Sequence, residues 1–213
     1  MRSAIVFCGG GPSRVRFEVP ADAFVVAADV GLAEATRLGV RTHLLVGDLD
    51  SVSAEDLAAF EAAGGEVRRH PEDKDATDLD LAIAEAIRGG AERVLVVGGD
   101  SGRLDHLLGN AWVLASPRHG SARMDAIFGA ARLHVVRGSR ELTGSDGELI
   151  SLFAVGGSAS GVSTKGLRWV LDDATLQPGS SLGISNEFSG DSASIKVRDG
   201  VVLAVRPGAG GSP

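Results

Sequence analysis

The stretch Arg93-Val94-Leu95-Val96-Val97-Gly98-Gly99-Asp100 decides the expected fold of this chain. Its apolar run from Val94 to Val97 has no polar face, which is typical of a strand buried on both sides in a parallel sheet. The run ends at two glycines and an aspartate, where the strand meets a loop. Because ligands of open α/β sheets bind beside the carboxyl ends of the strands, we expect a functional site near this loop.

Strand-like and helix-like segments alternate around this stretch throughout the first half of the chain. Short apolar runs predict strands at 4–8, 24–28, 43–46, 66–69 and 93–97. Helical patterns, some with Ser or Thr caps, predict helices at 30–38, 53–63, 77–87 and 104–115. The alternation predicts an α/β fold whose N-terminal part is a doubly wound, mostly parallel sheet with helices on both faces.

The pattern changes from about Met124 onward, where no helical period persists. Short β-rich runs, separated by glycine and serine, recur at 124–128, 132–136, 148–154, 167–171, 194–197 and 201–205. This pattern predicts a C-terminal antiparallel β-sandwich. We therefore expect a first domain at residues 1–130, a second at 131–207, and a disordered tail at 208–213.

Composition limits the classes of protein that the chain can belong to. Of its 213 residues, 44% are hydrophobic, enough for a sizeable core. The formal net charge of −7 argues against nucleic acid as the main partner. No segment approaches the ~20 apolar residues of a membrane span. The single cysteine, Cys8, is expected to be a small buried hydrophobe. We expect a cytoplasmic protein.

Three acidic clusters, at 47–51, 73–78 and 98–106, carry the chemical signal. Asp48 and Asp50 follow an expected strand two residues apart, so in an extended segment both carboxylates point the same way. Like charges on one side of a loop favour a cation between them, and Mg²⁺ takes such oxygen ligands. A solvated turn with helix-capping Asp and Ser is the alternative.

The second cluster begins a predicted helix. Thr77 is a good N-cap and Asp78 suits the positive end of the helix dipole, so capping alone would explain both residues. The functional interpretation is that Asp78 is a further metal ligand and Lys74 lies near phosphate.

In the third cluster, glycines allow backbone N–H groups to approach phosphate, and Arg103 offers a planar guanidinium. Asp105 and His106 then enter a helix. A flexible turn with a surface Arg–Asp pair is the alternative, and His106 alone suits a structural role better than that of a general base. Together the three clusters indicate a divalent cation that holds a polyphosphate.

The order of these motifs resembles that of the thiamine pyrophosphokinase family. The resemblance rests on Gly47-Asp48-Leu49-Asp50-Ser51, Asp75-Ala76-Thr77-Asp78 and Gly102-Arg103-Leu104-Asp105-His106 with Asn110, and in the second half on 164–171 and 183–188. Two places depart from the family pattern: Ser101-Gly102 stands before the arginine in place of Gly-Gly, and Val30-Gly31-Leu32 follows Asp29 in place of Gly-Gly-Ala.

The resemblance implies transfer of a pyrophosphoryl group from ATP to thiamine, with Mg²⁺, in a homodimer whose active sites lie at the interface. The implied metal ligands and catalytic residues are Asp48, Asp50 and Asp78. The implied nucleotide and polyphosphate site comprises Asp29, Lys74, Thr77, Arg103, Asp105 and His106. The implied thiamine-binding residues are Trp169, Ser185 and Asn186. Which carboxylate accepts the hydroxyl proton stays open.

An indole is a sensible partner for thiamine, a cation with two aromatic rings. Without the family resemblance, a tryptophan in a sandwich is more often a core residue, so a place in the core is the alternative for Trp169. Trp112, inside an apolar helix, is expected to be a core residue. Two other functions stay open: a pyrophosphokinase that acts on another alcohol such as a hydroxymethylpterin, and a non-catalytic module that binds thiamine or a nucleotide.

Overall fold

The structure is a computed structural model, and it describes residues 1–208. It divides into two compact units, one from Met1 to Gly129 and one from Ala130 onward. Of the tail expected at 208–213, only Gly208 lies among the described residues. No helix within residues 1–208 has the length and hydrophobicity needed to cross a lipid bilayer.

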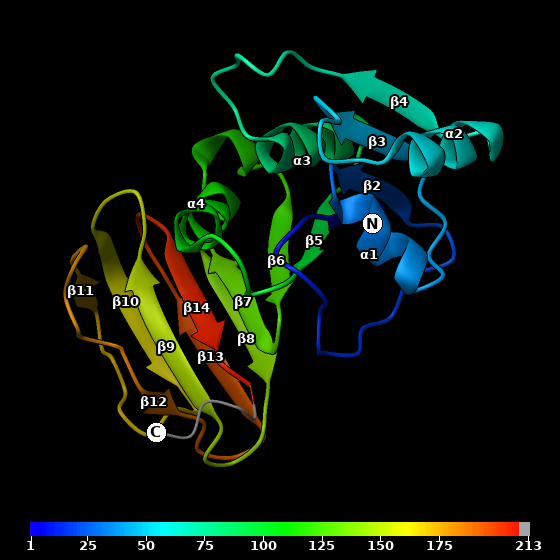
Figure 1. The fold of residues 1–213 in the computed structure, drawn as a ribbon. Helices are drawn as coiled ribbons and strands as arrows, with labels where there is room; N and C mark the ends of the chain where they lie inside the picture. Colours follow the sequence, from blue (N-terminus) through cyan, green and yellow to red (C-terminus); the bar gives the residue numbers. More distant parts are fainter. Residues whose placement is uncertain (209–213) are drawn as a thin grey trace. The chain divides into compact units, whose positions relative to one another are not determined.

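The first unit is built on a fully parallel sheet (Figure 1). Its strands are β1 Ser3–Phe7, β2 Phe24–Ala28, β3 Leu44–Gly47, β4 Glu66–Arg69, β5 Arg93–Gly98 and β6 Arg123–Phe128. Their order across the sheet is β6-β5-β1-β2-β3-β4, so the chain reverses direction across the sheet between β1 and β5. The strand that decides the fold, β5, lies between two other strands, and its Val94, Val96 and Val97 are buried.

Helices cover both faces of this sheet. They are α1 Gly31–Arg37, α2 Ala54–Ala62, α3 Asp78–Arg88 and α4 Leu104–Leu114, and a 3₁₀ turn η1 follows at Pro117–His119. Leu32 of α1 and Phe60 of α2 pack with Leu45 on one face, and α3 packs on β1, β2 and β3 from the other. The predicted doubly wound parallel sheet is confirmed.

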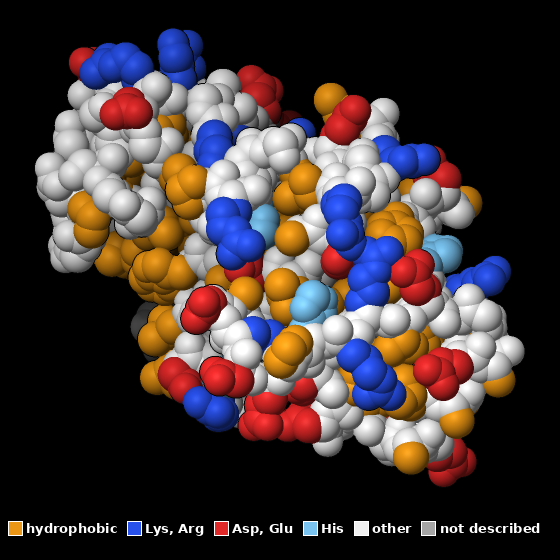
Figure 2. Space-filling model, turned by 90° about the horizontal axis from the view of Figure 1, so that it is seen from above, with side chains coloured by type: hydrophobic (Ala, Val, Ile, Leu, Met, Phe, Trp, Pro, Cys, Tyr) orange, Lys and Arg blue, Asp and Glu red, His pale blue; other side chains and the backbone are white. Residues whose placement is uncertain are grey.

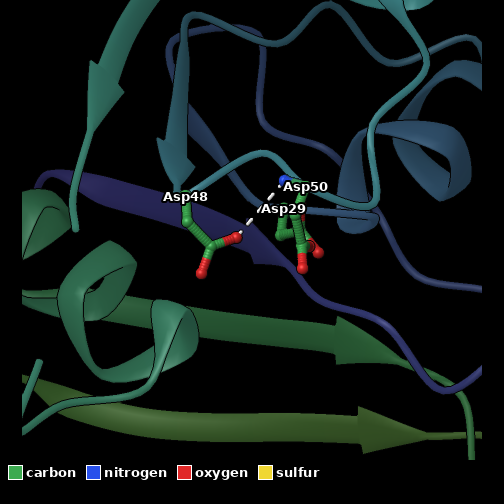
Figure 3. Close-up of side chains that lie close together, drawn as sticks. All are labelled: Asp29, Asp48 and Asp50. Atoms are coloured by element: carbon green, nitrogen blue, oxygen red, sulfur yellow. Dashed lines mark hydrogen bonds between the residues drawn. The ribbon is translucent and has the colours of Figure 1, made fainter. Parts of the chain in front are cut away.

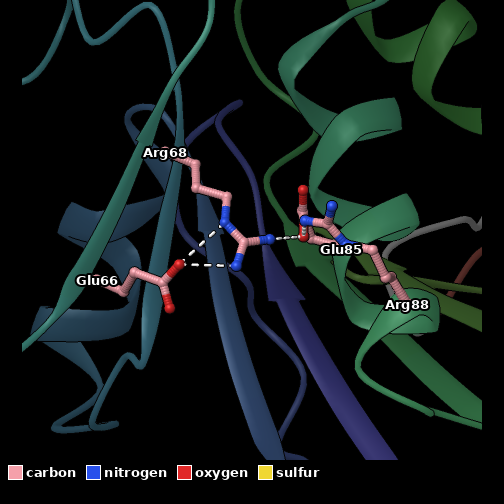
Figure 4. Close-up of polar contacts among 4 residues, drawn as sticks. All are labelled: Glu66, Arg68, Glu85 and Arg88. Atoms are coloured by element: carbon pink, nitrogen blue, oxygen red, sulfur yellow. Dashed lines mark hydrogen bonds and ion pairs between the residues drawn. The ribbon is translucent and has the colours of Figure 1, made fainter.

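Polar contacts hold α3 at both ends. Near its start, the carboxylate of Asp80 contacts Arg118 at 2.8 Å and the ring Nε2 of His119 at 2.7 Å, both on η1. Near its end, Glu85 pairs with Arg88 and with Arg68 of the edge strand β4, and Arg68 also donates to the carboxylate of Glu66 (Figure 4). These contacts fix the helix whose first residue is Asp78.

The second unit is the predicted antiparallel β-sandwich. One sheet pairs β12-β9-β14-β7 and the other β11-β10-β13-β8. The strands are β7 Ala131–Val136, β8 Ser139–Thr143, β9 Leu149–Ala154, β10 Ala159–Lys165, β11 Ala174–Leu176, β12 Asn186–Glu187, β13 Ser192–Lys196 and β14 Val202–Arg206. Ile150, Leu176 and Ile195 are among the buried side chains between them.

Two sequence-based expectations about this architecture are wrong. The run 167–171 is not a strand: Leu167 forms one isolated bridge with Phe188, and the residues after it form a loop. Conversely, no strand was expected at Ala159–Lys165, where β10 lies and pairs with both β11 and β13. Glycine and serine have low strand propensity, so only pairing with neighbours made this segment a strand.

Trp112 is also not a core residue. It is 55% exposed, and Leu104 and Leu108 on the same helix are 67% and 48% exposed. Spacings of four residues place the three side chains on one face of α4. The apolar residues of α4 therefore do follow a helical period, but the helix face that carries these three side chains is exposed to solvent. We call these three side chains the α4 stripe.

Candidate active site

Three aspartates converge at the carboxyl ends of β2 and β3. Asp29 follows β2, and Asp48 and Asp50 follow the neighbouring strand β3. One carboxylate oxygen of each lies within 4.8 Å of the others. Figure 3 shows the carboxylates of Asp29 and Asp50 close together, with that of Asp48 directed toward them. Residues from two parts of the sequence thus form one acidic site.

The segment that carries Asp48 and Asp50 is a turn, so the carboxylates do not meet through the extended geometry considered for the sequence. Leu49 between them has a left-handed backbone with φ 65°, and its side chain is buried beside Leu45 and Phe60. The Asp50 N–H donates to Asp48 Oδ1 at 3.3 Å. A left-handed leucine is unfavourable, and apolar burial of its side chain offsets that cost.

Asp29 is the most constrained carboxylate of the acidic site. Its Oδ1 is buried without a hydrogen-bond partner, and its φ is 45°. Burial raises the pKa of Asp29 above its ordinary value, a hydrogen bond from the Val30 backbone opposes this, and the charges of Asp78, Asp50 and Asp48 raise it further. A cation beside these carboxylates would relieve both the burial and the repulsion.

Asp78 and Lys74 complete the acidic site from the start of α3. A Cβ on Gly47 would lie 3.3 Å from the Cβ of Asp29 and 3.3 Å from the Cγ of Asp78, so glycine leaves the two aspartates room on either side. Lys74 Nζ lies 2.9 Å from Asp78 Oδ1 and 3.1 Å from Asp48 Oδ2. Burial lowers the pKa of Lys74, but these two contacts outweigh it and raise the pKa.

The described residues fit a small divalent cation. They supply only carboxylate oxygens, the ligands that Mg²⁺ prefers, and one of those oxygens is buried and unsatisfied. The grouping differs from the expected ligand set in one respect. Asp29 joins Asp48 and Asp50 within 4.8 Å, whereas Asp78 lies beside them and is held by Lys74.

The second unit contains a hollow of about 510 Å³ beside Trp169. Its lining includes Leu171, Ser180, Leu182, Ile184 and Asn186, and the indole itself is 52% exposed. The guanidinium of Arg168 lies 4.7 Å from the indole centroid and pairs with Glu187. The indole therefore belongs to the surface of this unit and is available to a ligand.

Residues 18–125 match the family model described as "Thiamin pyrophosphokinase, catalytic domain", and residues 133–202 match "Thiamin pyrophosphokinase, vitamin B1 binding domain". The chain belongs to the thiamine pyrophosphokinase family. The resemblance found in the sequence motifs is thereby confirmed.

Individual relatives agree with this membership. The chain is 27% identical over 164 residues to thiamine pyrophosphokinase 1 of rice. The matched region covers 70% of this chain and 60% of the rice protein. It is 23% identical over 183 residues to thiamine pyrophosphokinase of Bacillus subtilis, with 85% and 86% covered. The crystal structure of the B. subtilis protein matches with a TM-score of 0.82 at 21% identity, over 97% of this chain and 99% of that one. That likeness shows the shared fold.

The remaining residues that the family pattern implies are partly engaged in local structure. Thr77 caps α3, because its Oγ1 accepts the Asp80 N–H at 3.2 Å. Arg103 and Asp105 form an exposed ion pair, with Nη2 of Arg103 2.6 Å from Oδ2 of Asp105. The hydrogen bond from Arg103 lowers the pKa of Asp105 to about 2. His106 is exposed on the first turn of α4.

The glycines after β5 have a structural partner that the sequence did not indicate. The N–H groups of Gly99 and Ser101 donate to the carbonyls of Gly9 and Gly10, at 3.2 and 3.0 Å. A Cβ on Gly99 would lie 1.8 Å from the Gly10 oxygen, so only glycine fits there. Two N–H groups of the loop expected to approach phosphate thus join it to the loop after β1. This junction lies between β1 and β5, where ligands of doubly wound sheets bind.

In this family member, Ser185 and Asn186 differ in exposure. Asn186 is 2% exposed, and its side chain bonds both the N–H and the carbonyl of Trp169. Ser185 has a left-handed backbone with φ 56°, and its N–H donates to Ser151 Oγ at 3.0 Å. Ser185 is an exposed residue, whereas the side-chain amide of Asn186 is hydrogen-bonded to the protein backbone.

Proposed function

We propose that this chain is an active thiamine pyrophosphokinase, which transfers a pyrophosphoryl group from ATP to the hydroxyethyl oxygen of thiamine. The products would be thiamine diphosphate and AMP. The proposal rests on the convergence of Asp29, Asp48 and Asp50 at one edge of the sheet in a chain that belongs to this family. The names of its relatives, thiamine pyrophosphokinases, agree with it. This chain spans about 60% of the length of the rice relatives.

For the metal, we propose Mg²⁺ with Asp48, Asp50 and Asp78 as ligands and Asp29 as a further carboxylate of the same site. A bound Mg²⁺ would neutralise charge on the polyphosphate and favour attack on it. Lys74 holds Asp48 and Asp78 in place and carries a positive charge toward the same region. Thr77 fixes the start of the helix that presents Asp78.

The chemical step forms a bond from the thiamine hydroxyl oxygen to the β-phosphorus of ATP and breaks the bond from that phosphorus to the α–β bridging oxygen. AMP leaves with that oxygen, and one of the clustered carboxylates takes up the hydroxyl proton. The protein contributes mainly by positioning the reactants and by charge stabilisation. Arg103, Asp105 and His106 stand at the start of α4, where we propose that they contact the nucleotide and its phosphates.

For thiamine, we propose the hollow beside Trp169. An exposed indole attracts a cationic aromatic ring by stacking and cation–π attraction, and here the neighbouring Arg168 is already neutralised by Glu187. Ser185 would contact the substrate directly. Asn186 would act through Trp169, because its own amide is occupied.

We further propose a homodimer with active sites at the interface, as the family resemblance implies. The α4 stripe supports it, because large apolar side chains spaced along one helix face are typical of a contact surface.

Acidic and basic side chains are interspersed over the face drawn in Figure 2, and this face has no broad basic surface for nucleic acid. The cytoplasm, which supplies ATP, is the compartment we propose.

The decisive test is incubation of the purified full chain with ATP, Mg²⁺ and thiamine, followed by chromatography for AMP and thiamine diphosphate. A parallel reaction with a hydroxymethylpterin in place of thiamine tests the closest alternative. We expect both products with thiamine, none after chelation of the metal, and much slower turnover with the pterin. Binding of thiamine or ATP without AMP formation would identify a non-catalytic module instead.

A further inference from the structure

Asp80 has a buried carboxylate that none of the proposed chemical steps uses. Its side chain is 11% exposed, with Oδ2 2.8 Å from Arg118 Nη1 and Oδ1 2.7 Å from the ring Nε2 of His119. The side chain of His119 is 1% exposed, whereas that of Arg118 is 63% exposed. We call these three side chains the η1 cluster, since Arg118 and His119 lie on the 3₁₀ turn η1.

Burial of such a charged cluster is weak evidence of a role in stability. Removing a carboxylate from water is costly, and apolar side chains of similar volume in place of a buried ion pair often leave a protein equally stable. Leu79 and Ile83 on the same helix are buried, so α3 accommodates apolar side chains next to Asp80. The η1 cluster is better explained by the geometry that its directional bonds impose.

Asp80 lies two residues after Asp78, which is a metal ligand in the proposed function. The Asp80 N–H donates to Thr77 Oγ1 at 3.2 Å, so the backbone of Asp80 is bonded to the residue that precedes Asp78. An acidic residue at this third helical position often bonds back to the N–H of the N-cap residue. Here the carboxylate instead joins the start of α3 to His119, 39 residues further along the chain.

The apolar contacts of α3 fix its position along its own axis less strictly than bonds do. Its buried face packs on β1, β2 and β3 through two small and two larger apolar side chains, Ala82, Ala86, Leu79 and Ile83. Packed helices slide on such surfaces by small shear displacements. A displacement of about 1 Å in a reacting group can cost about 100-fold in rate. Bonds from Asp80 to η1 oppose such sliding at the end of the helix where Asp78 lies.

We propose that Asp80 is a positioning residue, which holds the start of α3 against η1 and so keeps Asp78 at the distance from Asp48 and Asp50 that a shared metal ion requires. The proposal rests on the proposed function, because that function makes Asp78 a ligand. Asp80 acts through the helix and does not itself contact the metal or the substrates. Arg118 and His119 contribute only through Asp80.

The test replaces the buried pair with apolar side chains and measures metal binding directly. The main variant combines Asp80→Leu with His119→Leu. Arg118→Ala removes one contact at an exposed side chain, so it tests the cluster with little effect on folding. Asp80→Asn is the conservative variant, since its amide oxygen can still accept from Arg118. Binding of Mg²⁺ to each full chain is measured by calorimetry without substrates, and thermal unfolding checks that each chain is folded. The KM values for Mg²⁺ and thiamine are measured in the reaction.

Glu85→Leu is the matched control near the other end of α3. The Glu85 side chain is likewise 11% exposed and pairs with two basic residues, Arg68 and Arg88 (Figure 4). It lies about 10 Å beyond Asp78 along the helix. Its replacement should lower stability without moving the helix start, because the η1 cluster is intact in this variant.

We expect the Asp80→Leu, His119→Leu variant to bind Mg²⁺ at least about tenfold more weakly, the scale on which groups that orient metal ligands act. Its KM for Mg²⁺ should rise by a similar factor, while the KM for thiamine does not change. Arg118→Ala should weaken Mg²⁺ binding by a smaller factor, and Asp80→Asn should retain most of the affinity. Glu85→Leu should bind Mg²⁺ as the wild type does, even where its Tm falls as far as that of the main variant.

Wild-type Mg²⁺ affinity in Arg118→Ala and in the main variant, or in Arg118→Ala where the main variant does not fold, would overturn the proposal. Equal loss of Mg²⁺ affinity in Glu85→Leu would also overturn it, because the effect would then be a general loosening of α3. A wild type that makes no thiamine diphosphate but binds Mg²⁺ through Asp80 in this way would overturn the proposed function alone. A wild type that binds no Mg²⁺ would overturn both.

Discussion

The side-chain amide of Asn186 holds the backbone of Trp169 from both sides. Its Oδ1 accepts the Trp169 N–H at 3.1 Å, and its Nδ2 donates to the Trp169 carbonyl at 2.7 Å. Oδ1 also accepts the Glu187 N–H at 2.9 Å. Asn186 is buried, and its amide satisfies the backbone N–H and carbonyl of Trp169, which in a strand would be satisfied by a neighbouring strand. The position of the exposed indole therefore depends on a buried amide.

Replacing Asn186 with alanine should displace Trp169 and leave its backbone groups unsatisfied. We expect a free energy of unfolding lower by about 1–3 kcal/mol, the usual cost of orphaned buried polar groups. The KM for thiamine should rise about tenfold, whereas the KM for ATP should not change. Urea denaturation and steady-state kinetics measure these effects. Asn186→Asp keeps the acceptor but loses the donor, so it should fall between the two. An unchanged KM for thiamine in a folded Asn186→Ala variant would contradict this role.

Asp50→Asn tests the acidic site. Asp50 is exposed, and its Oδ1 accepts a hydrogen bond from the Ser51 hydroxyl, which the oxygen of an asparagine amide can accept as well, so the variant should fold with a nearly unchanged Tm. Turnover should fall by about 100-fold or more, the scale seen when a group that stabilises transition-state charge is removed. Product formation at saturating Mg²⁺ measures the loss. Asp22→Asn, an exposed aspartate outside the acidic site, is the control. Near-normal turnover of Asp50→Asn would rule out its role as a metal ligand.

Glu34 links pH to stability. Its buried carboxylate accepts from Arg37 and from the N–H and hydroxyl of Ser13. The hydrogen bond from Arg37, followed by those from Ser13, lowers the pKa of Glu34 although burial opposes them. A lowered folded-state pKa adds stability above the unfolded pKa of about 4.5, and that stability is lost as the pH falls through the folded value.

Glu34→Gln should therefore destabilise the protein at pH 7 by about 1.5–3 kcal/mol, the worth of hydrogen bonds to a charged group. Its stability should also depend less on pH below about 4.5 than that of the wild type. Denaturant unfolding of both proteins between pH 3 and 7 measures the two effects. Parallel pH profiles would show that Glu34 has no linkage to acid stability.

The α4 stripe makes a prediction about assembly. Burying one leucine side chain is worth about 1.5–3 kcal/mol, and a symmetric dimer buries it twice. Leu108→Lys should therefore raise the Kd of the dimer at least about 100-fold. The variant chain should still fold, because Leu108 is exposed in the single chain. Sedimentation velocity over a range of concentrations measures this, and Ala58→Lys controls for the added charge. A wild type that is monomeric at all concentrations, or an unaffected variant, would exclude the stripe from the interface.

Local patterns sufficed for most of the fold. The apolar run of β5 and the caps of α2 and α3 were correctly identified, because burial on both faces and capping are properties of neighbouring residues. They failed where long-range pairing decided the outcome. The strand β10 is rich in Ser and Gly and exists through its partners β11 and β13. The loop at 167–171 looks like a strand but is held by Asn186 instead.

By itself, the sequence determined the parallel sheet, the sandwich and the identity of the carboxylates at the strand ends, since period, turn residues and motif order are encoded locally. Only the tertiary structure decided which carboxylates meet. It placed Asp29 with Asp48 and Asp50 because β2 and β3 are neighbours, and it turned Leu49 into a left-handed conformation to bring them together. It also left Trp112 exposed and paired the glycines after β5 with those after β1. These outcomes depend on contacts between residues distant in the chain, which no local pattern specifies.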